Sequence, residues 1–173
     1  TVTPGNDTPV AVADTATVAE DTSLTRDVID NDTDIDGDDL TLTAVSTTSG
    51  TVAVNADQRS VDYTPAANFN GEVTITYTVS DGTLTDEGTL ILTVTPGNDT
   101  PVAVADTATV AEDTSVDRDV SDNDTDIDGD DLNLTAVSTT SVTVVVNADQ
   151  CSEDYTPEAN FNEDITNMYT LSH

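Results

Sequence analysis

The stretch Val73-Thr-Ile-Thr-Tyr-Thr-Val79 decides the fold, because apolar and hydroxyl side chains alternate along it with a period of two residues. Such alternation is typical of a strand in a half-buried antiparallel sheet. The pattern recurs in shorter stretches that are separated by turn residues such as Asp36-Gly37 and Asn70-Gly71. It predicts an all-β fold with about seven strands, expected over residues 10–19, 24–29, 40–46, 51–55, 59–64, 73–80 and 88–95.

The chain repeats itself, since residues 1–23 return letter for letter as residues 93–115 at an offset of 92. A period of this length is the size of one small domain, and seven short strands in roughly 100 residues suit an immunoglobulin-like sandwich. We therefore predict tandem β-sandwiches. The expected domains are residues 1–8 as the tail of a preceding repeat or linker, 9–95 as the first repeat, 96–100 as a linker and 101–173 as a second, C-terminally truncated repeat.

The second copy departs from the first towards its end. His173 aligns with Asp81, so no counterpart of the last strand is expected, and either the repeat is truncated or another chain supplies that strand. Glu153 and Asn167 replace Val61 and Ile75 at predicted inward positions. Buried polar groups are costly unless they find partners.

Composition restricts the possible partners. The 173 residues include 35 acidic and 3 basic side chains, for a formal net charge of −32. Nucleic acid and anionic membrane surfaces are excluded, because both require a basic surface, and no apolar run is long enough to insert into a membrane. So large an acidic excess destabilises a compact state by self-repulsion, which indicates either disorder or neutralisation by cations. The alternating apolar residues favour a folded, cation-neutralised chain.

An acidic loop is repeated in both copies and is the main candidate for cation binding. Asp32-x-Asp34-x-Asp36-Gly37 places carboxylates at alternate positions before a glycine turn. Hard cations such as calcium prefer oxygen ligands in this kind of spacing. Thr43 stands where an EF-hand needs its bidentate Glu, so this is not an EF-hand, and the plain alternative is a solvated acidic turn. The predicted ligands are Asp30, Asp32, Asp34, Asp36, Asp38 and Asp39, with Asp122, Asp124, Asp126, Asp128, Asp130 and Asp131 in the second copy.

The junction between the copies resembles the end of a cadherin repeat, where acidic turns and a linker bind calcium between neighbouring domains. Val79-Ser-Asp-Gly82 and the linker Asn98-Asp-Thr-Pro101 carry the resemblance, together with Ala19-Glu-Asp21 and Val61-Asp-Tyr63. The linker has one carboxylate fewer than the fuller cadherin linker, and Thr64 replaces a second acidic residue. The resemblance implies further calcium ligands at Glu20, Asp62, Asp81, Asn98, Asp99 and Glu112.

The whole repeat resembles the bacterial cadherin-like and VCBS-type tandem repeats of large secreted, RTX-type adhesins. The resemblance is carried by residues 31–40, by Asp62-Tyr-Thr-Pro-Ala-Ala-Asn-Phe-Asn-Gly71 and by Tyr77-Thr-Val-Ser-Asp-Gly82. It implies a cadherin-like sandwich that serves as an extracellular, calcium-stiffened spacer on a cell surface, with neighbouring repeats as its partners. The alternative is a filament subunit that self-associates by exchanging β-strands.

Catalysis is not expected. His173 is the single histidine and Cys151 the single cysteine, and neither has a nearby catalytic partner in the sequence. The carboxylates repeat identically on predicted turns, whereas glycoside hydrolysis needs two carboxylates in different environments within a cleft. The sequence therefore indicates a structural module and not an enzyme.

Overall fold

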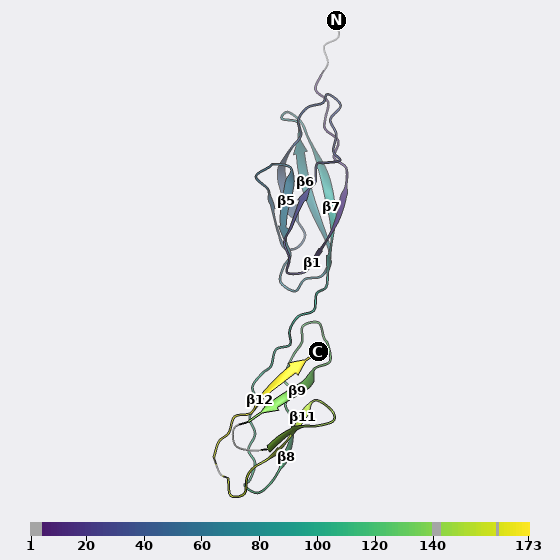
Figure 1. The fold of residues 1–173 in the computed structure, drawn as a ribbon. Helices are drawn as coiled ribbons and strands as arrows, with labels where there is room; N and C mark the ends of the chain where they lie inside the picture. The colour runs from purple at the N-terminus through teal and green to yellow at the C-terminus, as the bar shows by residue number, and fades with distance from the viewer. Residues whose placement is uncertain (1–4, 140–142, 162) are drawn as a thin grey trace. The chain divides into compact units, whose positions relative to one another are not determined.

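The computed structural model describes residues 5–139, 143–161 and 163–173, and the chain divides into two compact units, Thr1–Gly97 and Asn98–His173 (Figure 1). Throughout the described residues the regular elements are β-strands. The predicted all-β class is therefore confirmed. We refer to Thr1–Gly97 as unit 1 and to Asn98–His173 as unit 2.

Unit 1 contains all seven predicted strands in two sheets. The strands are β1 (Asp14–Ala19), β2 (Leu24–Asp27), β3 (Thr41–Thr47), β4 (Thr51–Val54), β5 (Ser60–Thr64), β6 (Gly71–Ser80) and β7 (Thr85–Thr95). One sheet has the order β1-β7-β6-β3 and the other β2-β5-β4. The β1–β7 pair is parallel, and every other pair in these two sheets is antiparallel.

The core of unit 1 lies between the two sheets and is built from the alternating positions. The inward residues of β6 and β7 are fully buried; they are Val73, Ile75, Tyr77, Val79, Leu90, Leu92 and Val94. Tyr77 lies opposite Gly88, and a β-carbon at Gly88 would collide with the tyrosine ring. Gly88 therefore makes the space in which the Tyr77 side chain lies.

In unit 1 the start of β1 and the side-chain facing of β3 depart from the sequence pattern, and β7 begins earlier than expected, at Thr85. β1 begins at Asp14 and not at residue 10, because Val10 forms an isolated bridge with Thr33, with an N-to-O distance of 2.7 Å. In β3 the register shifts between Leu42 and Ala44, so Leu42 is buried while Ala44 is exposed. Period-two alternation alone would put Leu42 and Ala44 on the same face, but the bulge turns the residues after it to the opposite face.

Unit 2 repeats five of these strands. They are β8 (Val116–Asp119), β9 (Asn133–Ser138), β10 (Thr143–Val146), β11 (Ser152–Thr156) and β12 (Met168–Ser172). They form the sheets β10-β11-β8 and β12-β9 and correspond to β2–β6 of unit 1. Residues 106–111, which have the sequence of β1, form no strand, and the 173 residues hold no counterpart of β7.

The two polar replacements in the core of unit 2 contact each other. Asn167 Nδ2 donates to Glu153 Oε1 at 3.0 Å, and Glu153 is 6% exposed. The pairing is incomplete, because Glu153 Oε2 and Asn167 Oδ1 are buried and have no partner in the described part of the chain. The expected cost of burying these groups is thus reduced by one hydrogen bond and not removed.

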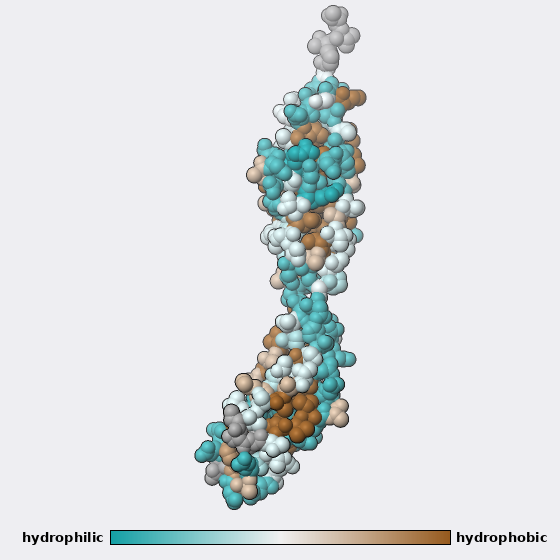
Figure 2. Space-filling model, viewed as in Figure 1, coloured by the Kyte–Doolittle hydropathy of each residue, from teal (hydrophilic) through white to brown (hydrophobic). Residues whose placement is uncertain are grey.

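Apolar side chains are exposed at matching places in the two units. Figure 2 shows that hydrophilic surface covers much of the viewed face of each unit and that apolar patches lie among the hydrophilic areas. The matching exposed residues are Val10, Val12 and Ile35 in unit 1 and Val102, Val104 and Ile127 in unit 2. Among the described residues we find no helix with the length and hydropathy required to cross a membrane.

Candidate metal centre

The acidic loop of unit 1 joins β2 to β3 and brings three carboxylates together. Asp34, Asp36 and Asp38 each offer an oxygen that lies within 4.8 Å of the other two. Asp34 organises the turn, because its Oδ1 accepts the N–H of Asp36 at 2.8 Å and that of Asp38 at 3.3 Å. Gly37 has a φ of 81°, a left-handed conformation that glycine adopts at little cost. The loop therefore places three anionic groups around one point.

The oxygens of this loop fit a hard cation. Oδ2 of Asp34 is buried, and no described residue donates a hydrogen bond to it. Burying a charged oxygen without a partner is costly, and carboxylates at this separation repel one another. Calcium takes roughly six to eight oxygen ligands in flexible geometry, so these three side chains and water satisfy its requirements.

The loop of unit 2 has the same arrangement. Asp126, Asp128 and Asp130 each place an oxygen within 4.8 Å of the others. Asp126 Oδ1 accepts the N–H of Asp128 at 2.9 Å and that of Asp130 at 3.4 Å, and Gly129 has a φ of 79°. Asp126 Oδ2 is buried and again has no partner in the described chain. The same local sequence thus builds the same three-carboxylate cluster in both units.

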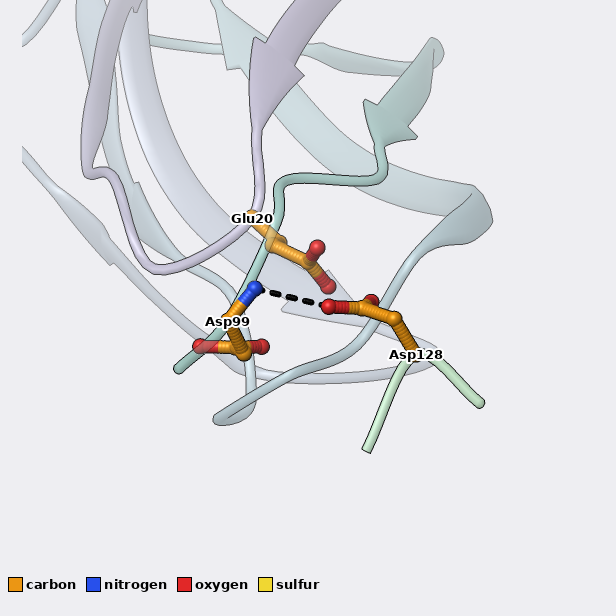
Figure 3. Close-up of side chains that lie close together, drawn as sticks. All are labelled: Glu20, Asp99 and Asp128. Atoms are coloured by element: carbon orange, nitrogen blue, oxygen red, sulfur yellow. Dashed lines mark hydrogen bonds between the residues drawn. The ribbon is translucent and has the colours of Figure 1, made fainter. Parts of the chain in front are cut away.

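In each unit, an entry segment near the N-terminal end of the unit contacts the acidic loop of the same unit. In unit 1 the backbone N–H of Asp7 donates to Asp36 Oδ2 at 2.8 Å. In unit 2 the N–H of Asp99 donates to Asp128 Oδ2 at 2.7 Å, the bond drawn in Figure 3. Asp99, predicted as a ligand from the linker, therefore reaches the acidic loop of its own unit through its backbone.

Asparagine side chains fix the same entry segments to a second turn. Asn6 Nδ2 donates to Asp81 Oδ2 at 2.9 Å, and Asn98 Nδ2 lies 2.9 Å from His173 Nδ1. The Leu84 and Thr83 N–H groups and the Asn6 amide hold the pKa of Asp81 below its usual range. His173 occupies the position of Asp81 in the second copy. The contact with the asparagine of the entry segment is therefore kept in unit 2, while one carboxylate is lost.

The remaining loop residues lie apart from the three-carboxylate cluster. Asp32 Oδ1 accepts the N–H of Val12 at 2.7 Å and the hydroxyl of Tyr77 at 3.2 Å. In unit 2, Asp124 Oδ1 accepts from Val104 N–H at 2.7 Å and from the Tyr169 hydroxyl at 3.2 Å. The four other predicted ligands in the loops have exposed side chains; they are Asp30, Asp39, Asp122 and Asp131.

The three other predicted ligands lie outside the loops. Glu20 is buried and accepts a short hydrogen bond from the N–H of Gly97. Glu112, its counterpart in unit 2, is exposed. Asp62 is exposed on β5 and accepts from Thr25 Oγ1 at 2.6 Å and from the Asn55 amide at 2.8 Å.

Asp14 is a buried acidic group that the sequence analysis missed. Asp14 is the first residue of β1, and its side chain is 4% exposed. Its neighbours are Arg26, whose Nη2 lies 3.6 Å from Asp14 Oδ1, and Asn31, whose amide lies 3.4 Å from the same oxygen. The sequence did contain a sign of this burial. Asp14 lies two and four residues before the inward-facing Ala16 and Val18, so its side chain belongs to the same face of the strand.

Burial raises the pKa values of three groups in this part of unit 1. It raises the pKa of Asp14, an effect that Arg26 partly offsets. Burial likewise raises the pKa of Asp32, against the hydrogen bond from Val12. The pKa of Tyr77 is raised first by burial and then by the negative charges of Asp32, Asp14 and Asp86.

A family model places the chain among known proteins. The model described as bacterial Ig domain matches residues 6–93 and again residues 98–172. The chain belongs to the bacterial Ig domain family. Together with the sheets described above, the two adjacent matches confirm the predicted tandem immunoglobulin-like β-sandwiches. Proteins of this family are commonly found outside the cell or on its surface.

Solved structures similar to the chain include endo-fucoidan hydrolases from glycoside hydrolase family 107. A variant of MfFcnA4 aligns with 22% identity and a TM-score of 0.38, covering 99% of this chain and 29% of that protein. MfFcnA9 aligns with 16% identity and a TM-score of 0.37, covering 98% of this chain and 34% of that protein. The bacterial Ig chain thus spans about a third of their length, and scores this low add nothing to the fold assignment. No curated protein matches the chain.

Proposed function

We propose that the chain is a non-catalytic, calcium-binding structural repeat that acts as a spacer in an extracellular adhesin or surface protein. The observation that carries the proposal is the buried, unpartnered Oδ2 of Asp34 beside Asp36 and Asp38, repeated at Asp126 in unit 2. A solvated acidic turn has no need to bury a charged oxygen without a donor. A cation-binding loop can bury such an oxygen, because the bound ion takes the place of the missing hydrogen-bond donor.

Calcium would act on stability by charge neutralisation and mass action. The chain carries a net charge of −32, so every bound divalent ion relieves repulsion within the folded state. A ligand that binds only the folded form stabilises it as its concentration exceeds the dissociation constant. Extracellular sites with dissociation constants of about 10⁻⁴–10⁻³ M are sufficient, because they match the affinities of known extracellular calcium modules.

The entry segment links the loop to the spacer role. Asp7 and Asp99 donate their N–H groups to Asp36 and Asp128, which belong to the two carboxylate clusters. An ion that orders a cluster therefore also orders the segment by which the chain enters that unit. In an array of such repeats, with neighbouring repeats as partners, this stiffens the connections and fits the cadherin-like and VCBS-type adhesin resemblance.

Calcium counting by isothermal titration calorimetry tests the proposal. The wild-type chain is expected to bind at least one ion per unit, and Asp36→Asn together with Asp128→Asn is expected to remove two ions per chain. Glu72→Gln is the matched control, because it removes one exposed charge from β6, away from the loops. A wild-type chain that binds no calcium at millimolar concentration would exclude the proposal.

A filament subunit is the second candidate function, and one observation favours it. β12 is paired only with β9 in the described residues, whereas its counterpart β6 is paired on both sides. An unpaired strand edge accepts strands from other chains. Light scattering separates the two functions at fixed calcium, since a spacer stays monomeric and a filament subunit forms particles that grow with time.

A further inference from the structure

We propose that unit 2 binds an incoming β-strand that carries a basic side chain, and that the buried pair Glu153 and Asn167 selects this strand. The incoming strand lies next to β12, in the position that β7 has in unit 1. It places its basic side chain where unit 1 has Leu90. This selectivity goes beyond the second candidate function and does not depend on calcium at the Asp loops.

In the described part of unit 2, β12 has a free edge. Its counterpart in unit 1, β6, is paired with β3 on one side and with β7 on the other. β12 is paired with β9 alone, and the 173 residues hold no counterpart of β7. The backbone groups on the other side of β12 are therefore available for a ladder of hydrogen bonds with an incoming strand.

The register of unit 1 indicates which side chain of such a strand meets Asn167. Ile75 on β6 lies opposite Leu90 on β7, and both side chains are fully buried. Asn167 has the position of Ile75 in the second copy. Directly opposite residues on neighbouring strands have β-carbons about 5 Å apart. An incoming side chain at the position of Leu90 therefore lies within reach of Asn167 and of its partner Glu153.

The two polar groups at this position lack a hydrogen-bond donor. Glu153 is 6% exposed, and its Oε2 has no partner among the described residues. Asn167 donates through Nδ2 to Glu153 Oε1 at 3.0 Å, while its own Oδ1 is buried without a partner there. Both unpaired atoms are acceptors. A basic side chain suits them best, because it supplies donors and also neutralises a buried carboxylate.

The arginine opposite Glu153 in the sheet does not fill this need. Arg118 on β8 is directly opposite Glu153 on β11. Its Nη2 pairs with Asp106 Oδ1 at 2.7 Å, and its Nε is buried without an acceptor in the described chain. Unit 1 has the fully buried Val61 and Ile75 in place of the polar pair, so it lacks these acceptors and serves as an internal control.

The basic strand is not β7 of a second copy. β7 carries Leu90 at the decisive position, and an apolar side chain donates no hydrogen bond. The chain has three arginines and no lysine. Arg26 and Arg118 lie on β2 and β8, which are paired within their own units, and Arg59 lies just before β5. The incoming strand therefore comes from a polypeptide segment outside these 173 residues.

Peptide binding to the full chain tests the inference. A peptide with the sequence of Thr85–Thr95 is compared with the same peptide carrying Leu90→Lys, by fluorescence anisotropy at fixed calcium. The Leu90→Lys peptide is expected to bind about tenfold more tightly, because a hydrogen bond to a charged group is worth roughly one decade of affinity. The matched control is a peptide with Thr89→Lys, which carries the same charge on the outward face and is expected to show no such gain.

A variant of the chain localises the effect. Glu153→Val together with Asn167→Ile gives unit 2 the apolar pair of unit 1, and the order of affinity is expected to reverse in favour of the unmodified peptide. Circular dichroism checks the folding of this variant. If it does not fold, Glu153→Gln replaces it and is expected to reduce the tenfold preference, because it removes the charge and keeps the shape. A preference that persists unchanged in the folded variant would overturn the inference.

Three further results would overturn the selectivity. Equal or tighter binding of the unmodified peptide assigns the edge to a β7-type strand, such as that of a second copy. An equal gain from Thr89→Lys means that affinity follows overall charge and not the contact with Glu153. Binding of neither peptide at millimolar concentration removes the strand site itself. None of these results bears on the calcium proposal, since calcium is held constant throughout.

Discussion

The same six residues form a strand in one unit and none in the other. Asp14–Ala19 is β1, paired in parallel with β7, whereas the identical sequence at residues 106–111 has no β7 counterpart and forms no strand. The two segments therefore have the same intrinsic strand propensity. Whether they form a strand is decided by the presence of a neighbouring strand to pair with. This agrees with the context dependence of β-propensity, which reflects packing against neighbouring strands.

A second difference between the units lies in the core. Val61 and Ile75 are fully buried in unit 1, and the structure places Glu153 and Asn167 at the same positions in unit 2. A hydrogen-bonded polar pair thus replaces two buried apolar side chains. Unit 2 has both a smaller sheet and a more polar core, so we expect it to be the less stable of the two.

The largest effect is expected from weakening β7 in unit 1. Leu92 is fully buried and lies opposite Ala16 and Val73, so Leu92→Ala should lower the free energy of unfolding by about 2–5 kcal/mol. Amide protection in Asp14–Ala19 should fall with it, making unit 1 resemble unit 2. Urea unfolding and hydrogen exchange measure both effects. Thr93→Ala, at an exposed position of the same strand, is the control, and equal losses in the two variants would contradict the account.

Supplying the missing strand should change unit 2 in the opposite direction. A synthetic peptide with the sequence of Thr85–Thr95 is expected to pair with β12 and to induce strand structure in residues 106–111. At a hundred times its dissociation constant it would stabilise unit 2 by about 2.7 kcal/mol. NMR chemical shifts of residues 106–111 report the change. A peptide with Leu90 and Leu92 replaced by Asp should have no effect, and equal action of both peptides would refute strand pairing.

Restoring the apolar core should have a moderate effect on unit 2. Asn167→Ile alone removes the donor to Glu153 Oε1 and should destabilise by about 1–3 kcal/mol. Adding Glu153→Val recreates the pair of unit 1 and should recover that loss, with a gain over wild type of about 1–4 kcal/mol. A double-mutant cycle by urea unfolding provides the coupling energy. Additive effects of the two substitutions would contradict the pairing.

The smallest effect concerns a hairpin turn that the two units share. Asp57 accepts from Arg59 N–H and Ser60 N–H, both at 2.9 Å, and these bonds hold its pKa below the usual range. Bonds from Cys151 and Ser152 lower the pKa of Asp149 in the same way. Because the folded pKa lies below the unfolded one, this stabilisation is present above the unfolded pKa and is lost as pH falls through the folded value. Carbon-13 NMR titration should show both carboxyls ionising at lower pH than exposed aspartates, and ordinary values at either position would contradict the turn geometry.

The sequence predicted the strands of unit 1 well, whereas the metal ligands stay predictions. Period-two alternation identified all seven strands of unit 1, because one face of each sheet is buried. It did not identify the bulge after Leu42 or the coil at 106–111, since both depend on pairing with distant strands. The Asp spacing predicted that loop carboxylates lie together, as Asp34, Asp36 and Asp38 do. Buried Asp14 escaped notice because its contacts with Arg26 and Asn31 exist only in the folded sandwich.

The proposed function requires that calcium bound at the Asp loops stabilises the folded repeat. The most direct test follows thermal unfolding and hydrodynamic radius of the chain together during a calcium titration, with magnesium as the control. The melting temperature is expected to rise with calcium and more weakly with magnesium, because magnesium dehydrates reluctantly and demands stricter geometry. The hydrodynamic radius is expected to stay constant at a value typical of a monomer. A melting temperature unchanged up to millimolar calcium would contradict the account and leave the loops as solvated turns.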